Sequence, residues 1–124
     1  PAPGQGALAV EGLAEREDLR DLLWGLNDHT SGAELACERA FSARLEGGCS
    51  VPLGCLARAA RGSLIVTGYL GSDAAERGLR DRISGPLDSA ADIGRELAEA
   101  ILAAGGDEII EELRAAEPSL PSPP

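Results

Sequence analysis

One of the three cysteines of this sequence, Cys49, is a candidate for a reactive thiol. Cys49 follows Gly47 and Gly48 and precedes a Ser-Val-Pro run, so we expect it on a loop. A thiolate there would be a soft nucleophile. The alternative is a small packing cysteine beside an ordinary Gly-Gly helix stop. The residue types alone favour this alternative, because most cysteines are packing residues.

The surroundings of Cys49 act on its thiol in opposite directions. The preceding segment is expected to be helical, and a helix C-terminus disfavours an anion. Arg44 would offset this effect if its side chain turned toward the loop. Cys37 and Cys55 fall within an expected helix and an expected strand, which indicates small core residues.

Two other polar positions near the start of the chain are candidate binding residues. Gln5, between Gly4 and Gly6, could donate its amide hydrogens to a carboxylate, although an ordinary glycine turn before a strand fits equally well. His29 is the only histidine, and a lone histidine is more often a structural hydrogen-bonding residue than a catalyst. Glu38 is expected on a solvated helix face, paired with a neighbouring arginine.

Two helices are expected in the first part of the chain. Four leucines at spacing i, i+3, i+4 and i+7 predict a helix from about Glu15 to Leu26; they are Leu19, Leu22, Leu23 and Leu26. Ser31 and Glu34 have the form of a capping box, which predicts a second helix from Ser31 to about Leu45. Its buried side is expected to consist of Leu35, Ala36, Ala40, Phe41 and Leu45.

After Cys49 the residue pattern becomes typical of β-strands. Strands are expected over residues 50–59, 63–70 and 79–84, separated by turns at Arg61-Gly62 and at residues 71–73. A third helix, capped by Asp88 or Ser89, is predicted to bury Ile93, Leu97, Ala100, Ile101 and Ala104. Gly105-Gly106 should stop it, and Asp107 should start a last helix. Ala7 to Glu11 could form one more short strand.

Short turns between three consecutive strands favour antiparallel pairing. The sequence therefore predicts an α+β fold, a three-stranded antiparallel sheet with helices covering one face.

Composition excludes several functional classes. The chain has 124 residues, 11 basic against 21 acidic, a net charge of −10, and only one each of Trp, Tyr and Phe. These numbers argue against a nucleic-acid or anionic-membrane partner. Three cysteines, one histidine and no CxxC leave no disulfide framework and no zinc site, so no metal is expected. No apolar run or leader pattern is present, which makes the cytoplasm the expected compartment.

The run from Glu38 to Gly54, ERAFSARLEGGCSVPLG, carries a resemblance. It resembles the cofactor-attachment segment of the porphobilinogen deaminase family, also called hydroxymethylbilane synthases. Pro1 to Glu11 is similar to the family's Pro-Ala-x-Gly-Gln-Gly-Ala segment, and Leu26-Asn27 followed by His29 resembles its Leu-Asn-His region. Asp28 stands where the family often has a histidine, and Leu97 to Ile110 resembles the family's terminal helices.

The resemblance implies a chemistry for the whole protein. The family condenses four porphobilinogen molecules into a linear tetrapyrrole and releases ammonia. By resemblance, Cys49 holds a dipyrromethane cofactor through a thioether, while Gly47 and Gly48 leave room for the adduct. Gln5 and Gly6 are implied to help hold the cofactor or the growing chain.

The resemblance also implies which part of the protein this is. The family has three domains, and the third is an open three-stranded antiparallel sheet with helices on one face. Residues 1–26 would be the tail of the preceding domain, residues 27–116 the cofactor-anchoring α+β domain, and residues 117–124 a disordered Pro-rich tail. The chain begins without Met, so we expect an upstream part.

The family's substrate-binding basic residues and its catalytic Asp belong to the first two domains. We therefore expect no catalytic residue in this chain, contact with porphobilinogen and pyrrole intermediates only through the missing domains, and neither activity nor bound dipyrromethane in the chain alone. The alternative is a non-enzymatic regulatory or dimerisation α+β module of another enzyme, served by the uncovered sheet face. An upstream coding sequence without an Arg-rich two-domain region would favour this alternative.

Overall fold

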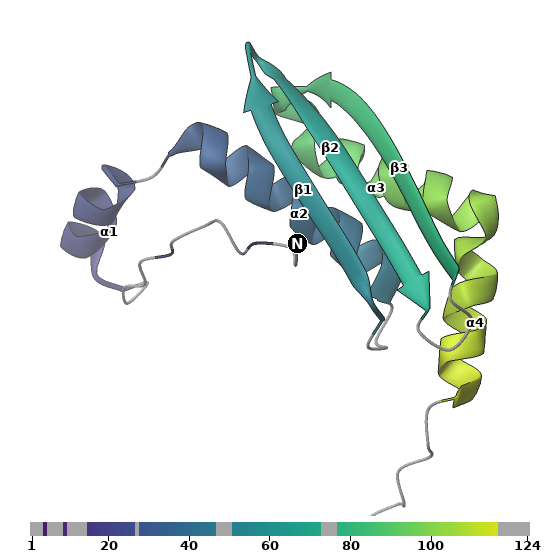
Figure 1. Ribbon diagram of the computed structural model, residues 1–124. Helices are drawn as coiled ribbons and strands as arrows, with labels where there is room; N and C mark the ends of the chain where they lie inside the picture. The colour runs from purple at the N-terminus through teal and green to yellow at the C-terminus, as the bar shows by residue number, and fades with distance from the viewer. Residues whose placement is uncertain are drawn as a thin grey trace, which may run out of the picture.

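The computed structural model describes Gly4, Ala9 and residues 15–26, 28–46, 51–72 and 77–116, and its architecture confirms the predicted α+β class. The described elements, in order, are α1 (Glu17–Trp24), α2 (His29–Glu46), β1 (Leu53–Ala60), β2 (Ser63–Ser72), β3 (Arg77–Pro86), α3 (Ala90–Ile101) and α4 (Asp107–Ala116). A 3-10 turn (Leu87–Ser89) precedes α3, and a π-helical turn (Leu102–Gly106) follows it. The three strands lie side by side as one layer (Figure 1).

The sheet has the order β1-β2-β3, and both pairings are antiparallel. Arg61 and Gly62, with φ of 52° and 79°, make the tight turn between β1 and β2 at the predicted position. The predicted turn at residues 71–73 is shifted, because β2 continues through Gly71 and Ser72. Antiparallel hairpins explain how three short strands form a sheet without crossover connections.

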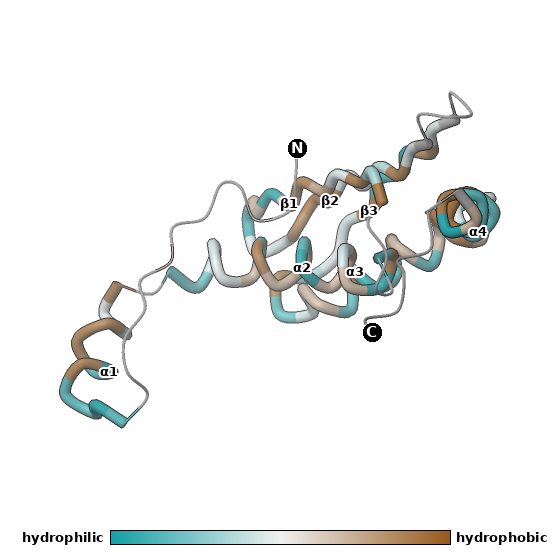
Figure 2. Tube along the Cα trace, turned by 90° about the horizontal axis from the view of Figure 1, so that it is seen from below, coloured by the Kyte–Doolittle hydropathy of each residue, from teal (hydrophilic) through white to brown (hydrophobic). Residues whose placement is uncertain are grey.

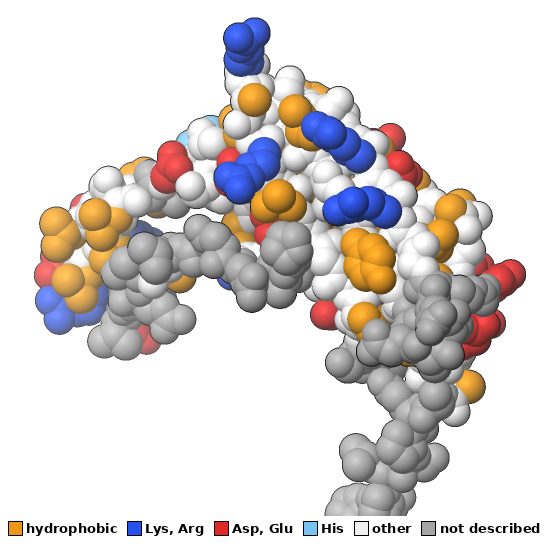
Figure 3. Space-filling view, in the orientation of Figure 1, with side chains coloured by type: hydrophobic (Ala, Val, Ile, Leu, Met, Phe, Trp, Pro, Cys, Tyr) orange, Lys and Arg blue, Asp and Glu red, His pale blue; other side chains and the backbone are white. Residues whose placement is uncertain are grey.

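Helices cover only one face of this sheet, as predicted. In Figure 2, which is turned by 90° from Figure 1, α2 and α3 both lie on the same side of the strands. The opposite face carries side chains that are open to solvent (Figure 3). The alternation of side chains along each strand therefore separates an inner, helix-covered face from an outer, open face.

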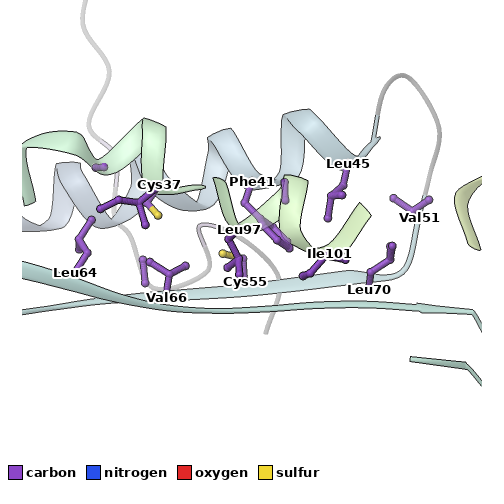
Figure 4. Close-up of a cluster of buried hydrophobic side chains, with 14 of the residues drawn as sticks. Cys37, Phe41, Leu45, Val51, Cys55, Leu64, Val66, Leu70, Leu97 and Ile101 are labelled. Atoms are coloured by element: carbon purple, nitrogen blue, oxygen red, sulfur yellow. The ribbon is translucent and has the colours of Figure 1, made fainter. Parts of the chain in front are cut away.

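The core lies between the inner face of the sheet and the two helices. Figure 4 shows α2 contributing Cys37, Phe41 and Leu45, α3 contributing Leu97 and Ile101, and the sheet facing them with Cys55, Leu64, Val66 and Leu70. Cys37 and Cys55 are free and buried, which confirms the prediction that they are core residues.

Two glycines explain how closely these layers pack. A Cβ on Gly94 of α3 would lie 2.2 Å from the carbonyl oxygen of Cys37, so the backbones of α2 and α3 approach at this point. A Cβ on Gly68 of β2 would lie 2.6 Å from the ring of Phe41 and 2.9 Å from Leu97. Neither position has room for a side chain, because the neighbours are buried.

The ends of α2 and α3 differ from the predicted caps. Helix α2 begins at His29, and the carboxylate of Asp28 accepts hydrogen bonds from the Ser31 hydroxyl (2.5 Å) and the Ser31 backbone N–H (3.3 Å). Asp28, not Ser31, is therefore the capping residue, since a carboxylate at this place meets the free N–H groups of the first turn. Ser89 precedes α3 without a side-chain capping bond.

The predicted buried sets need smaller corrections. Ala36 is exposed on the solvent side of α2, and Ala104 is exposed in the π-helical turn after α3. Leu35, Ala40 and Ala100 are half-buried. The Gly105-Gly106 break is confirmed: Gly105 has φ of 117°, and α4 starts at Asp107 with Ile109 and Ile110 buried. The π-helical turn carries the chain from α3 into α4.

Helix α1 confirms the helix predicted over Glu15–Leu26 but lies apart from the sheet and the other helices (Figures 1 and 2). None of its residues is buried, and Leu22 and Leu26 are 70% and 69% exposed. Leu19 and Leu23 of the same apolar stripe are half-buried, so the stripe is covered in part. The predicted strand over residues 7–11 and the predicted tail over 117–124 lie outside the described residues, apart from Ala9.

Candidate functional site

The residues predicted to hold the cofactor lie outside the described part of the chain. This applies to Cys49, Gly47 and Gly48, and also to Gln5 and Gly6. The residues on both sides of the Cys49 segment are described. Helix α2 leads into it at Glu46, and the chain continues at Val51, which is buried. Pro52 then accepts a hydrogen bond from the Gly71 N–H at 2.9 Å, next to the last residue of β2.

The other two thiols are in an environment that suppresses nucleophilic chemistry. Cys37 and Cys55 are 0% and 1% exposed. Burial, together with a smaller contribution from the neighbouring Glu38 carboxylate, raises the pKa of Cys37 to about 11. Burial also raises the pKa of Cys55 to about 12, with smaller contributions from Cys37 and Glu38. Both thiols are protonated at neutral pH, so neither is a thiolate nucleophile or an accessible attachment point.

The arginine expected near the Cys49 segment is engaged elsewhere. The guanidinium Nε of Arg44 donates to the carboxylate of Glu99 on α3. Both side chains are about half exposed, so this ion pair joins the surfaces of α2 and α3. The suggestion that Arg44 turns toward the loop to favour a thiolate is therefore not supported, because Glu99 holds its guanidinium on the helical side.

A buried glutamate joins the start of the chain to this domain. Glu38 is only 8% exposed, and its Oε1 accepts a hydrogen bond from the backbone N–H of Gly4 at 2.8 Å. Its Oε2 accepts from the N–H of Ala57 in β1 at 3.3 Å. The predicted solvated role for Glu38 is wrong, because the side chain turns inward to two backbone donors. Gly4 directly precedes Gln5 and Gly6, so Glu38 fixes one end of that candidate segment against α2 and β1.

A second carboxylate on α2 acts in the same way. Glu34 accepts a hydrogen bond from the Ala59 N–H at 3.0 Å. Strand β1 is at the edge of the sheet, and Ala57 and Ala59 are alternate residues of that strand, so the two glutamates satisfy successive outward N–H groups. The i, i+4 spacing of Glu34 and Glu38, on the same side of α2 as Phe41 and Leu45, was the available sequence signal for this role. Edge strands covered in this manner resist pairing with another chain.

The histidine and the possible metal ligands complete the account of the described residues. His29 is exposed at the first position of α2. Within the described ranges, no group of three or more His, Cys, Asp or Glu side chains could hold a metal ion. Over the same residues, no helix is long and apolar enough to cross a membrane. The structure places the two flanks of the Cys49 segment, Glu46 and Val51, and it joins Gly4 to Glu38 by a hydrogen bond.

Comparison with known proteins points to one family. The family model described as "Porphobilinogen deaminase, C-terminal domain" matches residues 33–103. A porphobilinogen deaminase of Synechococcus elongatus is 40% identical over 112 residues, which cover 90% of this chain and 35% of that protein. The porphobilinogen deaminase of Syntrophus aciditrophicus is 39% identical over 118 residues, covering 95% of this chain and 39% of that protein.

The match has two consequences. This chain spans between a third and two fifths of the length of these curated relatives. The matched range, residues 33–103, runs from α2 through the sheet to the end of α3, and so contains the Cys49 segment and both glutamates that cap the edge of β1. The chain belongs to the porphobilinogen deaminase family, and its matched part is the C-terminal domain of that family.

Proposed function

We propose that this chain is the cofactor-anchoring part of a hydroxymethylbilane synthase, the transferase that condenses four porphobilinogen molecules into a linear tetrapyrrole. Residues 1–26 would be the tail of the preceding domain and residues 27–116 the anchoring domain. The observation that carries the proposal is the contrast among the three thiols. Cys37 and Cys55 are buried with raised pKa values, so Cys49, inside the matched motif, is the one thiol left to hold a covalent group.

Cys49 would hold the dipyrromethane through its sulfur. Porphobilinogen would first lose its amino group as ammonia, which leaves an electrophilic methylene carbon on the pyrrole. The Cys49 thiol would then give up its proton and its sulfur would bond to that carbon, as a thioether that is not readily hydrolysed. When bound, the dipyrromethane would supply the free pyrrole end to which new units are added. A stable anchor allows the tetrapyrrole to leave while the sulfur keeps its own adduct. Gly47 and Gly48 would let the backbone come close to this adduct without steric conflict.

The buried Glu38 gives the anchor domain a second role. It holds the N–H of Gly4, so the Gln5-Gly6 segment starts from a fixed point beside β1. The rise of 1.5 Å per residue puts Glu38 about 12 Å along α2 from Glu46, where the Cys49 segment begins. Gln5 would then offer amide hydrogens to a carboxylate of the cofactor or of the growing chain.

The chain alone is expected to be inactive. Binding, protonating and deaminating porphobilinogen are assigned to domains beyond this chain. Its net charge of −10 also repels a substrate that carries acetate and propionate groups.

Intact-mass measurement on the full-length protein tests the assignment. Cys49→Ser should lose the mass of a covalent dipyrrole, whereas Cys37→Ala should retain it as the matched control. The control removes a thiol that is buried and protonated, and its packing defect is small. A full-length Cys49→Ser protein that still carries a covalent dipyrrole would show that the attachment residue is elsewhere.

The isolated chain allows a complementary test. A thiol-labelling reagent at neutral pH should modify one residue quickly, and peptide mapping should identify it as Cys49. Labelling of Cys37 and Cys55 should become fast only in denaturant, because folding buries both thiols. Tetrapyrrole synthesis by this chain alone would contradict the assignment of the catalytic groups to other domains.

A further inference from the structure

The open face of the sheet carries basic side chains next to an aromatic ring. Arg80 of β3 stands opposite Tyr69 of β2, and Arg82, two residues further along β3, points to the same face. Arg58 of β1 stands opposite Ile65, four residues before Tyr69, so its side chain points to that face too. Among the described residues, no carboxylate forms an ion pair with any of these three arginines.

Positive charge gathers on this face although the chain has a net charge of −10. Figure 3 shows basic side chains spread among hydrophobic ones over the strands. On the helical side, by contrast, Arg44 is neutralised by Glu99. The carboxylate of Asp81 accepts the backbone N–H of Arg82 at 2.8 Å, so it is occupied with the strand rather than with a guanidinium group. An anion that reaches the open face therefore meets guanidinium groups, whose planar set of N–H donors suits carboxylates.

A hollow of about 500 Å³ lies on this face, lined in part by Pro52, Leu56, Tyr69 and Arg80. The Tyr69 ring is 44% exposed and lies across the sheet, because a Cβ on Gly71 would come within 2.3 Å of its hydroxyl oxygen. The hollow thus combines an apolar wall, an open aromatic ring and a guanidinium group. A planar ring that bears carboxylates matches this combination, because its two kinds of group find separate partners.

The hollow is close along the chain to the proposed attachment residue. Pro52 lines it, and the Pro52 carbonyl accepts the N–H of Gly71, across which the Tyr69 ring lies. Cys49 comes three residues before Pro52, so the chain between them spans at most about 11 Å. A group bonded to Cys49 is therefore tethered within a short distance of the hollow.

We propose that the hollow, with Arg80 and Arg82, is a docking site for the carboxylate-bearing pyrrole chain attached to Cys49; this inference rests on the proposed function. The pyrrole rings would contact Leu56 and Tyr69, and their acetate and propionate groups would pair with the two arginines. These arginines are about 7 Å apart along β3, which allows them to bind separate carboxylates.

The tethered chain is a better occupant than free porphobilinogen. Exposed ion pairs are individually weak, so a free pyrrole with two carboxylates would be held poorly. A short tether raises the effective concentration at the site to about the millimolar range, and weak pairs are then sufficient. The site would thus hold the polyanionic chain in a protein whose net charge otherwise repels it.

Nitration of Tyr69 in the full-length protein tests the proposal. Tyr69 is the only tyrosine of this chain, so peptide mapping identifies its product. With a dipyrrole on Cys49, verified by intact mass, tetranitromethane should nitrate Tyr69 at least about threefold more slowly than in the Cys49→Ser protein, and added salt should reduce this protection. Each variant is compared with its own Cys49→Ser form, because a charge beside Tyr69 also changes the reactivity of the phenol.

Charge reversal makes the test specific. Arg80→Glu with Arg82→Glu should remove the protection, because the new carboxylates repel those of the pyrrole chain. Arg39→Glu, a reversal at an exposed position of α2 on the helical side, is the matched control and should keep the protection. Circular dichroism of both variants establishes that they are folded.

The possible failures are distinguishable. A full-length protein without a dipyrrole on Cys49 contradicts the proposed function, and this inference with it. A dipyrrole on Cys49 that leaves Tyr69 nitration unchanged overturns the docking site alone. Protection of the Cys49→Ser protein by micromolar free porphobilinogen would assign the hollow to free substrate and overturn the tethered occupant. Resistance of Tyr69 to nitration in the Cys49→Ser protein itself would show that another part of the protein covers the hollow, which also overturns the proposal.

Discussion

The two faces of the sheet differ in how far their side chains are covered. On the inner face, Gly68 lies directly against the ring of Phe41, and a single added Cβ would clash with it. On the outer face, Tyr69 lies across Gly71 and Gly78, and its ring is 44% exposed. Both faces use an aromatic ring over glycine. Only the inner ring is enclosed by helices, so only there does the contact exclude water completely.

This difference decides which substitutions should affect the stability of the fold. The inner face buries apolar side chains from α2, α3 and all three strands, and it carries the hydrophobic free energy that holds the domain together. The outer face presents charged side chains that can change with little effect on that core. Substitutions on the inner face should therefore alter stability more than those on the outer face.

The largest expected effect is at Phe41. Phe41→Ala removes a ring with 0% exposure and should lower the free energy of unfolding by about 3–5 kcal/mol. Tyr69→Ala, the matched change on the outer face, should cost much less, because its ring is already partly hydrated. Urea unfolding followed by circular dichroism measures both. Equal losses of unfolding free energy in the two variants would contradict the distinction between the faces.

A smaller loss is expected where a side chain is added. Gly68→Ala places a Cβ 2.6 Å from the Phe41 ring and should cost about 1–3 kcal/mol. Gly32→Ala is the control, since a Cβ there meets nothing within 4 Å and should stabilise α2 by up to about 1 kcal/mol. The contact can be tested more specifically by combining Gly68→Ala with Phe41→Leu. The double variant should lose less free energy of unfolding than the sum of the losses of the two single variants.

Much of the inner face was predictable and little of the site was. The apolar spacing of α2 and α3, and the short turns between strands, led to the correct sheet and to helices on one face. Asp28 was missed as a cap because Ser31 and Glu34 imitate a capping box. Glu38 was missed because whether a glutamate faces water or an edge strand depends on tertiary placement, which local spacing does not reveal. Cys49 stays a prediction from its motif, because it lies outside the described residues.

The next prediction concerns the border of the inner face, where polar groups replace apolar ones. Glu38→Ala leaves the N–H groups of Gly4 and Ala57 without their acceptor, and this should cost about 1–3 kcal/mol. Hydrogen exchange at these two amides should accelerate more than at the amides of β2. Glu96→Ala, at an exposed position on α3, is the control and should change neither stability nor exchange. Unchanged exchange at Gly4 in the Glu38→Ala variant would show that this carboxylate does not fix the start of the chain.

The smallest effect is expected at the cap of α2, outside the packed surface altogether. The Ser31 hydroxyl and backbone N–H donate to Asp28 and lower the pKa of its carboxyl. A group whose pKa is lowered by folding stabilises the folded state above its unfolded pKa, about 4, and this contribution is lost as the pH falls through the lower folded pKa. Asp28→Ala should therefore be less stable than wild type at pH 7, and the difference should shrink below about pH 4.

Asp28→Asn is the informative partner variant, because an amide oxygen accepts the same hydrogen bonds but does not titrate in this range. Its difference from Asp28→Ala should stay nearly constant with pH, whereas the difference between wild type and Asp28→Ala should not. Urea unfolding at pH 7, 5 and 3 on all three proteins provides the comparison, and subtracting one variant from another removes the titration of carboxylates that they share. A difference between wild type and Asp28→Ala that persists unchanged at pH 3 would mean that the ionised carboxylate is not what caps α2.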